Sequence, residues 1–183
     1  MLLALTAGAA RAGAADALEQ RRRCFAAQKE EAVTACGAAL DLGLTARAAA
    51  VVRELLAATL AELGRYAEVV TLFRQAAEAA PGDAAAQLEL GSALVHFAGE
   101  PDDALLPLQA AVHLRPDDAR AYGELGLALH RLGQHAEAVA AFGEAERLDP
   151  TYFDDRPAAR ATYEASKRGQ AWPPADGAAP PQP

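Results

Sequence analysis

The stretch that decides the fold runs from residue 119 to residue 150 and reads ARAYGELGLALHRLGQHAEAVAAFGEAERLDP. Its apolar residues recur at intervals of three and four on both sides of Gly133, which predicts two amphipathic helices joined by a turn. Small residues such as Gly126 permit these helices to pack closely, and large residues such as Phe142 fill the seam to the next pair. Pro150 predicts the end of the second helix.

The same spacing recurs earlier in the chain. From Ala50 it is kept without gaps by Leu56, Leu60, Gly64, Arg65, Tyr66, Val69, Phe73, Ala76 and Pro81. From Ala84 it is kept by Leu90, Gly91, Leu94, Ala104, Leu108, Ala111 and Pro116, provided that one residue is inserted in the turn at residues 98–101. The second half of a degenerate first copy is kept by Ala32, Cys36 and Ala39. The chain therefore contains an internal repeat, whose helix pairs bury their apolar faces against one another.

This pattern resembles the tetratricopeptide repeat, whose Leu-Gly pair is followed by Ala, an aromatic residue, Ala and Pro. The resemblance covers about residues 13–152 and implies an all-α fold, a right-handed superhelical array of antiparallel helix pairs closed by a C-terminal capping helix. The expected segments are a repeat array at 16–152 (a degenerate repeat at 16–46 and repeats at 50–83, 84–118 and 119–152), a capping helix at 153–169 and a disordered Pro-rich tail at 170–183. Within the array, Pro107 falls inside a second helix, where we expect a small kink that is tolerated because the second helix faces outward.

The N-terminal residues resemble a secretory signal peptide over residues 1–15. A short apolar run, MLLALTAGAA, is followed by small residues at Ala12 and Ala14, as in an A-x-A-like cleavage pattern. The run is too short to span a bilayer, which requires about 20 apolar residues. A positive n-region is missing, because Leu2 follows Met1 directly. We therefore expect a periplasmic or secreted protein, and the alternative is an Ala-rich helical extension of a cytoplasmic one.

The composition favours helices and disfavours one class of partner. Hydrophobic residues make up 52% of the chain and aromatic residues only 5%, so that Ala and Leu carry the apolar content. The formal net charge of −8 argues against nucleic acid, because a nucleic-acid binder needs clustered Lys and Arg.

Motifs for catalysis are missing from the sequence. It contains no G-x-S-x-G elbow, P-loop or G-x-G-x-x-G motif. The acidic pairs Glu30-Glu31 and Asp102-Asp103 lie at or near expected helix starts, where carboxylates are favoured by capping and by the helix dipole. We therefore expect no enzymatic activity.

Histidine spacing suggests a metal site only at first sight. His96, His113 and His130 are separated by half a repeat, but equivalent positions on neighbouring helices lie about 10 Å apart. Metal–nitrogen bonds are about 2 Å long, so these residues would not share one ion. We expect neither a metal nor another cofactor.

Cys24 and Cys36 lie on the paired helices of the degenerate first repeat. In a reducing cytosol they would be small buried hydrophobic residues, whereas in an oxidising compartment facing cysteines on antiparallel helices can form a disulfide. The signal-like start favours the disulfide, which would reinforce the repeat with the weakest packing pattern.

The resemblance also implies a partner-binding groove, because set positions of each first helix line the concave surface in this family. In this sequence the groove would contain Glu54, Glu62, Leu88, Ser92, His96, Arg120, Leu127, His130 and Arg131. The Lys/Asn set with which chaperone-cofactor members clamp a carboxylate is not matched. We expect a non-catalytic scaffold or adaptor that binds a protein or peptide segment. The alternative is a module that self-associates through its terminal helices, and the sequence leaves the oligomeric state open.

Overall fold

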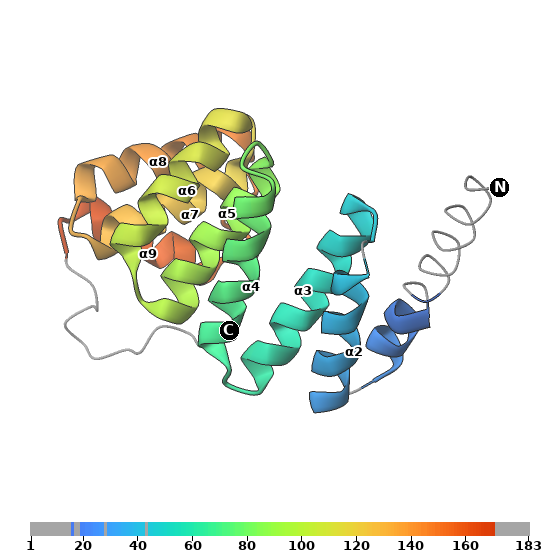
Figure 1. The fold of residues 1–183 in the computed structure, drawn as a ribbon. Coiled ribbons are helices and arrows are strands. Elements are labelled where there is room, and N and C mark those ends of the chain that lie inside the picture. Colours follow the sequence, from blue (N-terminus) through green and yellow to red (C-terminus); the bar gives the residue numbers. More distant parts are fainter. Residues whose placement is uncertain (1–15, 17–18, 28, 43, 171–183) are drawn as a thin grey trace. The chain divides into compact units, whose positions relative to one another are not determined.

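The computed structural model describes residues 16, 19–27, 29–42 and 44–170, and all regular secondary structure in this part of the chain is helical (Figure 1). Residues 19–26 form the first described helix. The later elements are α2 (Glu30–Asp41), α3 (Ala46–Glu62), α4 (Tyr66–Ala79), α5 (Ala84–Ala93), the π-helical turn η1 (Leu94–Ala98), α6 (Pro101–Leu114), α7 (Ala119–Arg131), α8 (His135–Leu148) and α9 (Pro157–Lys167). The expected all-α fold is confirmed. The expected signal peptide, and the Pro-rich tail beyond Gln170, lie outside the described residues.

The chain forms two compact units, residues 1–72 and residues 73–183, with the boundary inside α4. In the first unit α2 packs against α3. In the second unit each helix from α5 to α8 packs against the one that follows it. The terminal helix α9 contacts both α7 and α8, so it covers the last helix pair as a capping helix. No described helix is both long and apolar enough to cross a membrane.

Short-range sequence features explain where the helices begin and end. The Asp118 carboxylate accepts hydrogen bonds from the backbone N–H groups of Arg120 (3.0 Å) and Ala121 (3.3 Å), and thus caps α7. The Asp83 carboxylate caps α5 in the same way by accepting from the N–H of Ala85 (3.0 Å). The second helices α4, α6 and α8 each end two residues before a proline, at Pro81, Pro116 and Pro150, as the sequence predicts.

The turns inside two of the helix pairs have the same backbone conformation. Gly64 and Gly133 adopt φ values of 72° and 74°, in the left-handed region that glycine enters at little cost. The next N–H in each case bonds back across the turn, from Arg65 to the Leu60 carbonyl (2.8 Å) and from Gln134 to the Leu129 carbonyl (2.9 Å). The repeated glycine therefore ends each first helix with a Schellman-type turn.

The repeat at residues 84–118 departs from this geometry. The sequence predicts its extra residue in the turn at residues 98–101, but the structure accommodates it one turn earlier, in η1. There the N–H of Gly99 bonds to the Leu94 carbonyl, five residues back, where an α-helix would bond four residues back. The insertion therefore widens the last helical turn, and the assignment of the insertion to the turn at 98–101 is corrected.

The core of the last helix pair depends on Gly126 and Phe142. The Phe142 side chain is fully buried, and a Cβ atom at Gly126 would lie 2.9 Å from the Phe142 ring. The ring also lies near Phe153 (6.1 Å between centroids) and near Tyr163 of α9 (5.6 Å). In the neighbouring α6, Pro107 is among the buried residues. The adjacent Leu106 is the residue that faces solvent, with 77% of its surface exposed.

Replacing Gly126 with alanine is expected to destabilise the second unit. Overpacking against Phe142 costs about 1–3 kcal/mol, and the better helix propensity of alanine returns about 1 kcal/mol. The matched control is Gly143→Ala in α8, where the new Cβ would meet only the Tyr163 hydroxyl at 3.8 Å, so that this variant should be stabilised. Urea unfolding followed by circular dichroism measures both. Shifts of the same sign in the two variants would contradict the packing described here.

Candidate functional site

The first helices of two successive repeats meet in the second unit. Both α5 and η1 contact α7 directly, so that residues on these elements can form one surface. The His96 imidazole Nε2 lies 3.0 Å from a carboxylate oxygen of Glu124, across the boundary between the two repeats. The His96 side chain is 36% exposed and the Glu124 side chain 16% exposed. This pair therefore lies at the surface, where the first helices of the two repeats meet.

Glu124 is the residue of this surface that the sequence analysis missed. It follows Arg120 by four residues and precedes Arg131 by seven, so the three share one helix face. That spacing could have identified it. Its carboxylate also affects the ionisation of a buried tyrosine. Burial raises the pKa of Tyr152 to about 12, and the negative charge of Glu124 contributes to this rise.

Arg131 has a structural role that the groove prediction does not include. Its guanidinium Nη1 donates a hydrogen bond to the carbonyl oxygen of Val95 in η1. The last carbonyl groups of a helix lack partners within the helix and carry partial negative charge, so a cation there is favourable. Burial lowers the pKa of Arg131, and the carboxylate of Glu124 opposes that effect. Arg131 therefore caps the end of the preceding first helix.

His130 does not line an open groove, and its assignment there is corrected. It is 1% exposed, and its Nδ1 lies 2.8 Å from the hydroxyl oxygen of Ser166 in α9. The Ser166 hydroxyl donates its proton to the Thr162 carbonyl (2.9 Å), so its oxygen accepts from His130, and Nδ1 carries the proton. The capping helix covers this histidine, which the sequence could not reveal because Ser166 lies 36 residues away.

The burial of His130 predicts a loss of stability at acidic pH. Desolvation, and then the positive charges of His135 and Arg131, hold the pKa of His130 below its usual value of 6.5. The neutral form is therefore favoured in the fold, and its contribution is complete above pH 6.5 and is lost as the pH falls through the folded pKa. We expect the urea midpoint of the second unit to decrease as the pH is lowered from 6.5 towards the folded pKa of His130. His130→Asn keeps a donor near the Nδ1 position without titrating and should show a weaker dependence; an unchanged dependence would contradict the assignment.

The other predicted groove residues divide by exposure. Leu88 is buried (4% exposed), so its assignment to an open groove is wrong as well. Leu127 is partly buried and packs against the cluster that contains Phe142, while Ser92 is half-buried. The exposed members are Glu54, Glu62, His96 and Arg120. Glu54 and Glu62 belong to the first unit, and the others to the second. The role of these exposed residues in binding stays a prediction.

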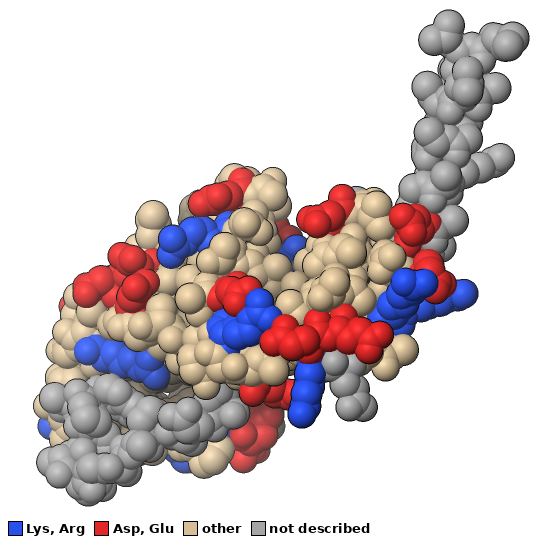
Figure 2. Space-filling view, turned by 60° about the horizontal axis from the view of Figure 1, so that its bottom comes forward, with Lys and Arg blue, Asp and Glu red and all other residues tan. Residues whose placement is uncertain are grey.

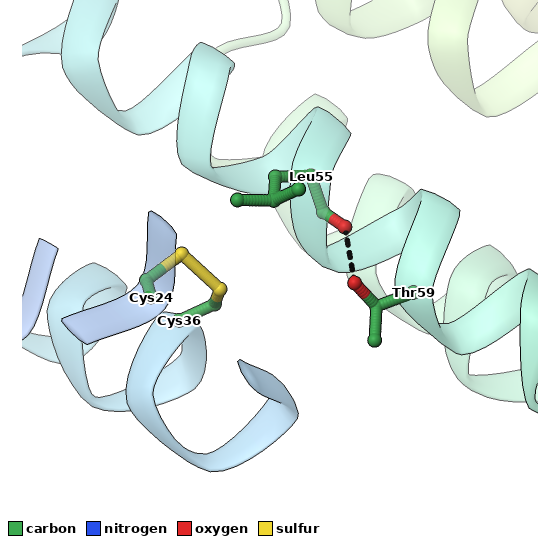
Figure 3. The surroundings of a disulfide bond; sticks show 4 residues. All are labelled: Cys24, Cys36, Leu55 and Thr59. Carbon is green, nitrogen blue, oxygen red and sulfur yellow. Dashed lines mark hydrogen bonds between the residues drawn. A yellow bond between two sulfur atoms is a disulfide. The ribbon is translucent and has the colours of Figure 1, made fainter. Parts of the chain in front are cut away.

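The first unit contains a disulfide between Cys24 and Cys36, with the two Cα atoms 4.6 Å apart (Figure 3). It joins the helix at residues 19–26 to α2, and both cysteines are buried. Leu55 and Thr59 of α3 lie beside it, and the Thr59 hydroxyl is satisfied by donating to the Leu55 carbonyl (2.9 Å). The disulfide therefore lies within the packing of the first unit. Oxidation in the native protein stays a prediction.

The acidic residues considered for catalysis occupy helix starts. Glu30 and Glu31 lie in the first turn of α2, and Asp102 and Asp103 in the first turn of α6, as expected for the helix dipole. Glu30 also accepts a hydrogen bond from the guanidinium of Arg65 (2.7 Å). No group of three or more His, Cys, Asp or Glu among the described residues could hold a metal ion.

Acidic and basic side chains are interspersed on the face that Figure 2 shows.

Comparisons with known proteins identify the family. Residues 97–153, which include α6, α7 and α8, match the sequence profile of the tetratricopeptide repeat. The solved structure of YrrB, described as a TPR protein with an unusual peptide-binding site, is 26% identical with a TM-score of 0.57, and the match covers 76% of this chain and 68% of YrrB. The chain contains the tetratricopeptide repeat. The resemblance found in the sequence is thereby confirmed.

Two further relatives of this tetratricopeptide repeat protein differ in what they show. MamA from Desulfovibrio magneticus RS-1 is 24% identical with a TM-score of 0.61, and the match covers 85% of this chain and 93% of the MamA structure, which establishes a shared fold. The peroxisomal targeting signal receptor of Candida albicans is 34% identical over 91 residues. That match spans 48% of this chain but only 15% of the receptor's length. Tetratricopeptide repeats are modules for binding proteins, which agrees with the general function expected from the sequence.

Proposed function

We propose that this tetratricopeptide repeat protein is a non-catalytic scaffold that holds a segment of a partner polypeptide along its first helices. One observation carries the proposal: the first helices of successive repeats, α5 with η1 and α7, contact each other directly. Their exposed side chains therefore present one surface to a partner. Repeat arrays use such surfaces to hold extended or helical segments.

The chemistry of this surface suits a polypeptide. His96 and Glu124 form a polar pair that can exchange hydrogen bonds with a peptide backbone, and Ser92 adds a hydroxyl group. Arg120 is exposed near the start of α7 and can pair with a carboxylate of the partner. YrrB has a peptide-binding site and the Candida protein is a targeting signal receptor, and both relatives therefore support a binding role of this kind.

The test is capture of a partner by the full chain, followed by measurement of its affinity for Arg120→Ala. A charge-assisted hydrogen bond contributes about 1.5–3 kcal/mol, so the variant should bind about tenfold more weakly or worse. The matched control is Arg147→Ala, which removes an arginine from the second helix α8, where its side chain is 64% exposed. Arg131 is unsuitable for this test because it stabilises η1. Equal affinity of native protein and Arg120→Ala would remove Arg120 from the site, and the absence of any captured partner would overturn the proposed function.

An oxidising compartment, periplasmic or extracellular, is part of this proposal. The support is that Cys24 and Cys36 are buried together at bonding distance, and such pairs persist mainly outside the cytosol. Alkylation of the two cysteines before and after reduction tests it.

A further inference from the structure

The first unit contains a pocket that is lined by both exposed apolar side chains and arginines. It has a volume of about 670 Å³, within the usual range for sites that bind small molecules or short segments. One wall is the helix at residues 19–26, and the other is the start of α3. These are the first helices of the two N-terminal repeats, so the pocket opens between elements of the kind that bind partners in this family.

Two of the apolar side chains that line the pocket are large and unusually exposed. Phe25 is 54% exposed and Val51 is 46% exposed, and both line the pocket. An exposed phenylalanine keeps most of its apolar surface in water, which is unfavourable unless a partner covers it. Aromatic side chains are enriched among the residues that contribute most to binding. The pair therefore offers a place for one bulky apolar side chain.

The charged part of the pocket is entirely basic. Arg21, Arg22 and Arg47 line it, in a chain whose formal net charge is −8. None of the three forms an ion pair or hydrogen bond with another residue of the described ranges. By contrast Arg65, in the same unit, is paired with Glu30 and Glu68. Three guanidinium groups beside an apolar patch are complementary to carboxylates that flank an apolar residue.

The start of α3 adds to this positive field. Its first turn contains no acidic residue, although an N-terminal helix end favours negative charge, and it contains Arg47 instead. Thr45 caps the helix by accepting from the N–H of Ala48 and also lines the pocket. A carboxylate supplied by a partner would therefore meet both the helix end and the guanidinium groups.

We infer that this pocket binds an acidic segment of a partner polypeptide that carries a bulky apolar side chain, with the apolar group against Phe25 and Val51 and its flanking carboxylates on Arg21, Arg22 and Arg47. The inference rests on the proposed function and specifies the chemistry of the partner. The disulfide contributes indirectly, because Cys24 precedes Phe25 and holds this helix to α2.

The binding experiment uses the oxidised full chain and a fluorescein-labelled hexapeptide pool, Glu-Glu-X-X-Glu-Glu, in which X is Leu, Ile, Phe or Trp. Fluorescence anisotropy should detect binding that weakens as salt is raised. A pool with lysine in place of glutamate, and one with serine at X, should each bind at least about tenfold more weakly. Failure of the acidic apolar pool to bind, or equal binding of the three pools, would overturn the inference.

Matched variants locate the site. Arg21→Ser, Arg22→Ser and Arg47→Ser together should weaken binding of the acidic pool at least about tenfold, as should Phe25→Ser alone. The control replaces three arginines that do not line the pocket, Arg74, Arg147 and Arg168, with serine and thus changes the net charge equally. This control should bind within about twofold of the native chain. Equal weakening by both triple variants would show a non-specific charge effect and overturn the site.

Partner capture separates this inference from the proposed function. If the native chain and the pocket triple variant capture the same partner with equal affinity, the pocket is not its binding site and the inference fails while the proposed function stands. If the native chain captures no partner, the proposed function fails, and the peptide measurements decide the pocket separately. Loss of the partner only in the pocket triple variant supports both.

Discussion

Replacing Phe142 with alanine is expected to lower the free energy of unfolding of the second unit by about 3–5 kcal/mol, the usual cost of deleting a buried aromatic side chain. Phe142 is fully buried and is among the largest such side chains of the described residues. Its ring contacts α7 at Gly126 and lies near Phe153 and near Tyr163 of α9. The variant would leave a cavity where three helices meet, and these contacts resist its collapse.

Urea unfolding followed by circular dichroism measures this loss, with the transition of the second unit fitted separately. The matched control is Phe25→Ala, the same substitution at a side chain that is 54% exposed, where the change should stay within about 0.5 kcal/mol. We also expect α9 to become more accessible to protease in Phe142→Ala, because the ring supports its docking. A loss below about 1 kcal/mol would contradict the role of Phe142 as the central packing residue.

Removing the disulfide by Cys24→Ala and Cys36→Ala is expected to destabilise the first unit by about 3 kcal/mol, since the cross-link limits the unfolded chain. The cysteines are 12 residues apart in sequence, so the loop is short, yet it includes the connection between the helix at 19–26 and α2. The same helix carries Phe25 and two arginines of the pocket. The double variant should therefore also bind the acidic peptide pool less tightly.

The oxidation state is measured directly in protein from its native host. Alkylation of the denatured protein before reduction should leave both thiols unmodified, and alkylation after reduction should add two groups. Reductant should lower the stability of the native chain but not of the double alanine variant, which is the matched control. Two freely alkylated cysteines in the unreduced protein would refute both the disulfide and the oxidising compartment.

Helices and turns were largely predictable because local patterns determine them. Apolar residues at intervals of three and four define both helices of the last pair, and Pro150 follows the end of α8 as expected. The left-handed turn at Gly133 requires only the backbone freedom of glycine. The acidic pair Asp102-Asp103 was correctly interpreted as belonging to a helix start. In each case the deciding interactions join residues within about one helical turn.

The candidate sites were less predictable, for a physical reason. Family positions assigned both Arg120 and His130 to the groove; Arg120 is exposed, but His130 is buried by α9. The pocket around Phe25 was not foreseen, since its two walls come from helices that the sequence separates. Exposure is a property of packing between helices, and a position within one repeat does not determine it.

What the sequence by itself determined is therefore the all-helical repeat and the ends of most helices, because hydrophobic periodicity, proline and glycine act over short distances. The tertiary structure decided which individual polar side chains are buried and which residues they form hydrogen bonds with. His130 bonds to Ser166 and Arg131 to the Val95 carbonyl, each across 36 residues. The Val95 carbonyl that accepts from Arg131 belongs to η1, the π-helical turn that contains the extra residue of this repeat. A polar group whose hydrogen bonds are made to other residues of the chain stabilises the fold, whereas a polar group that remains exposed can bind a partner. Which residues lie close enough to form those hydrogen bonds is determined by the packing of the helices.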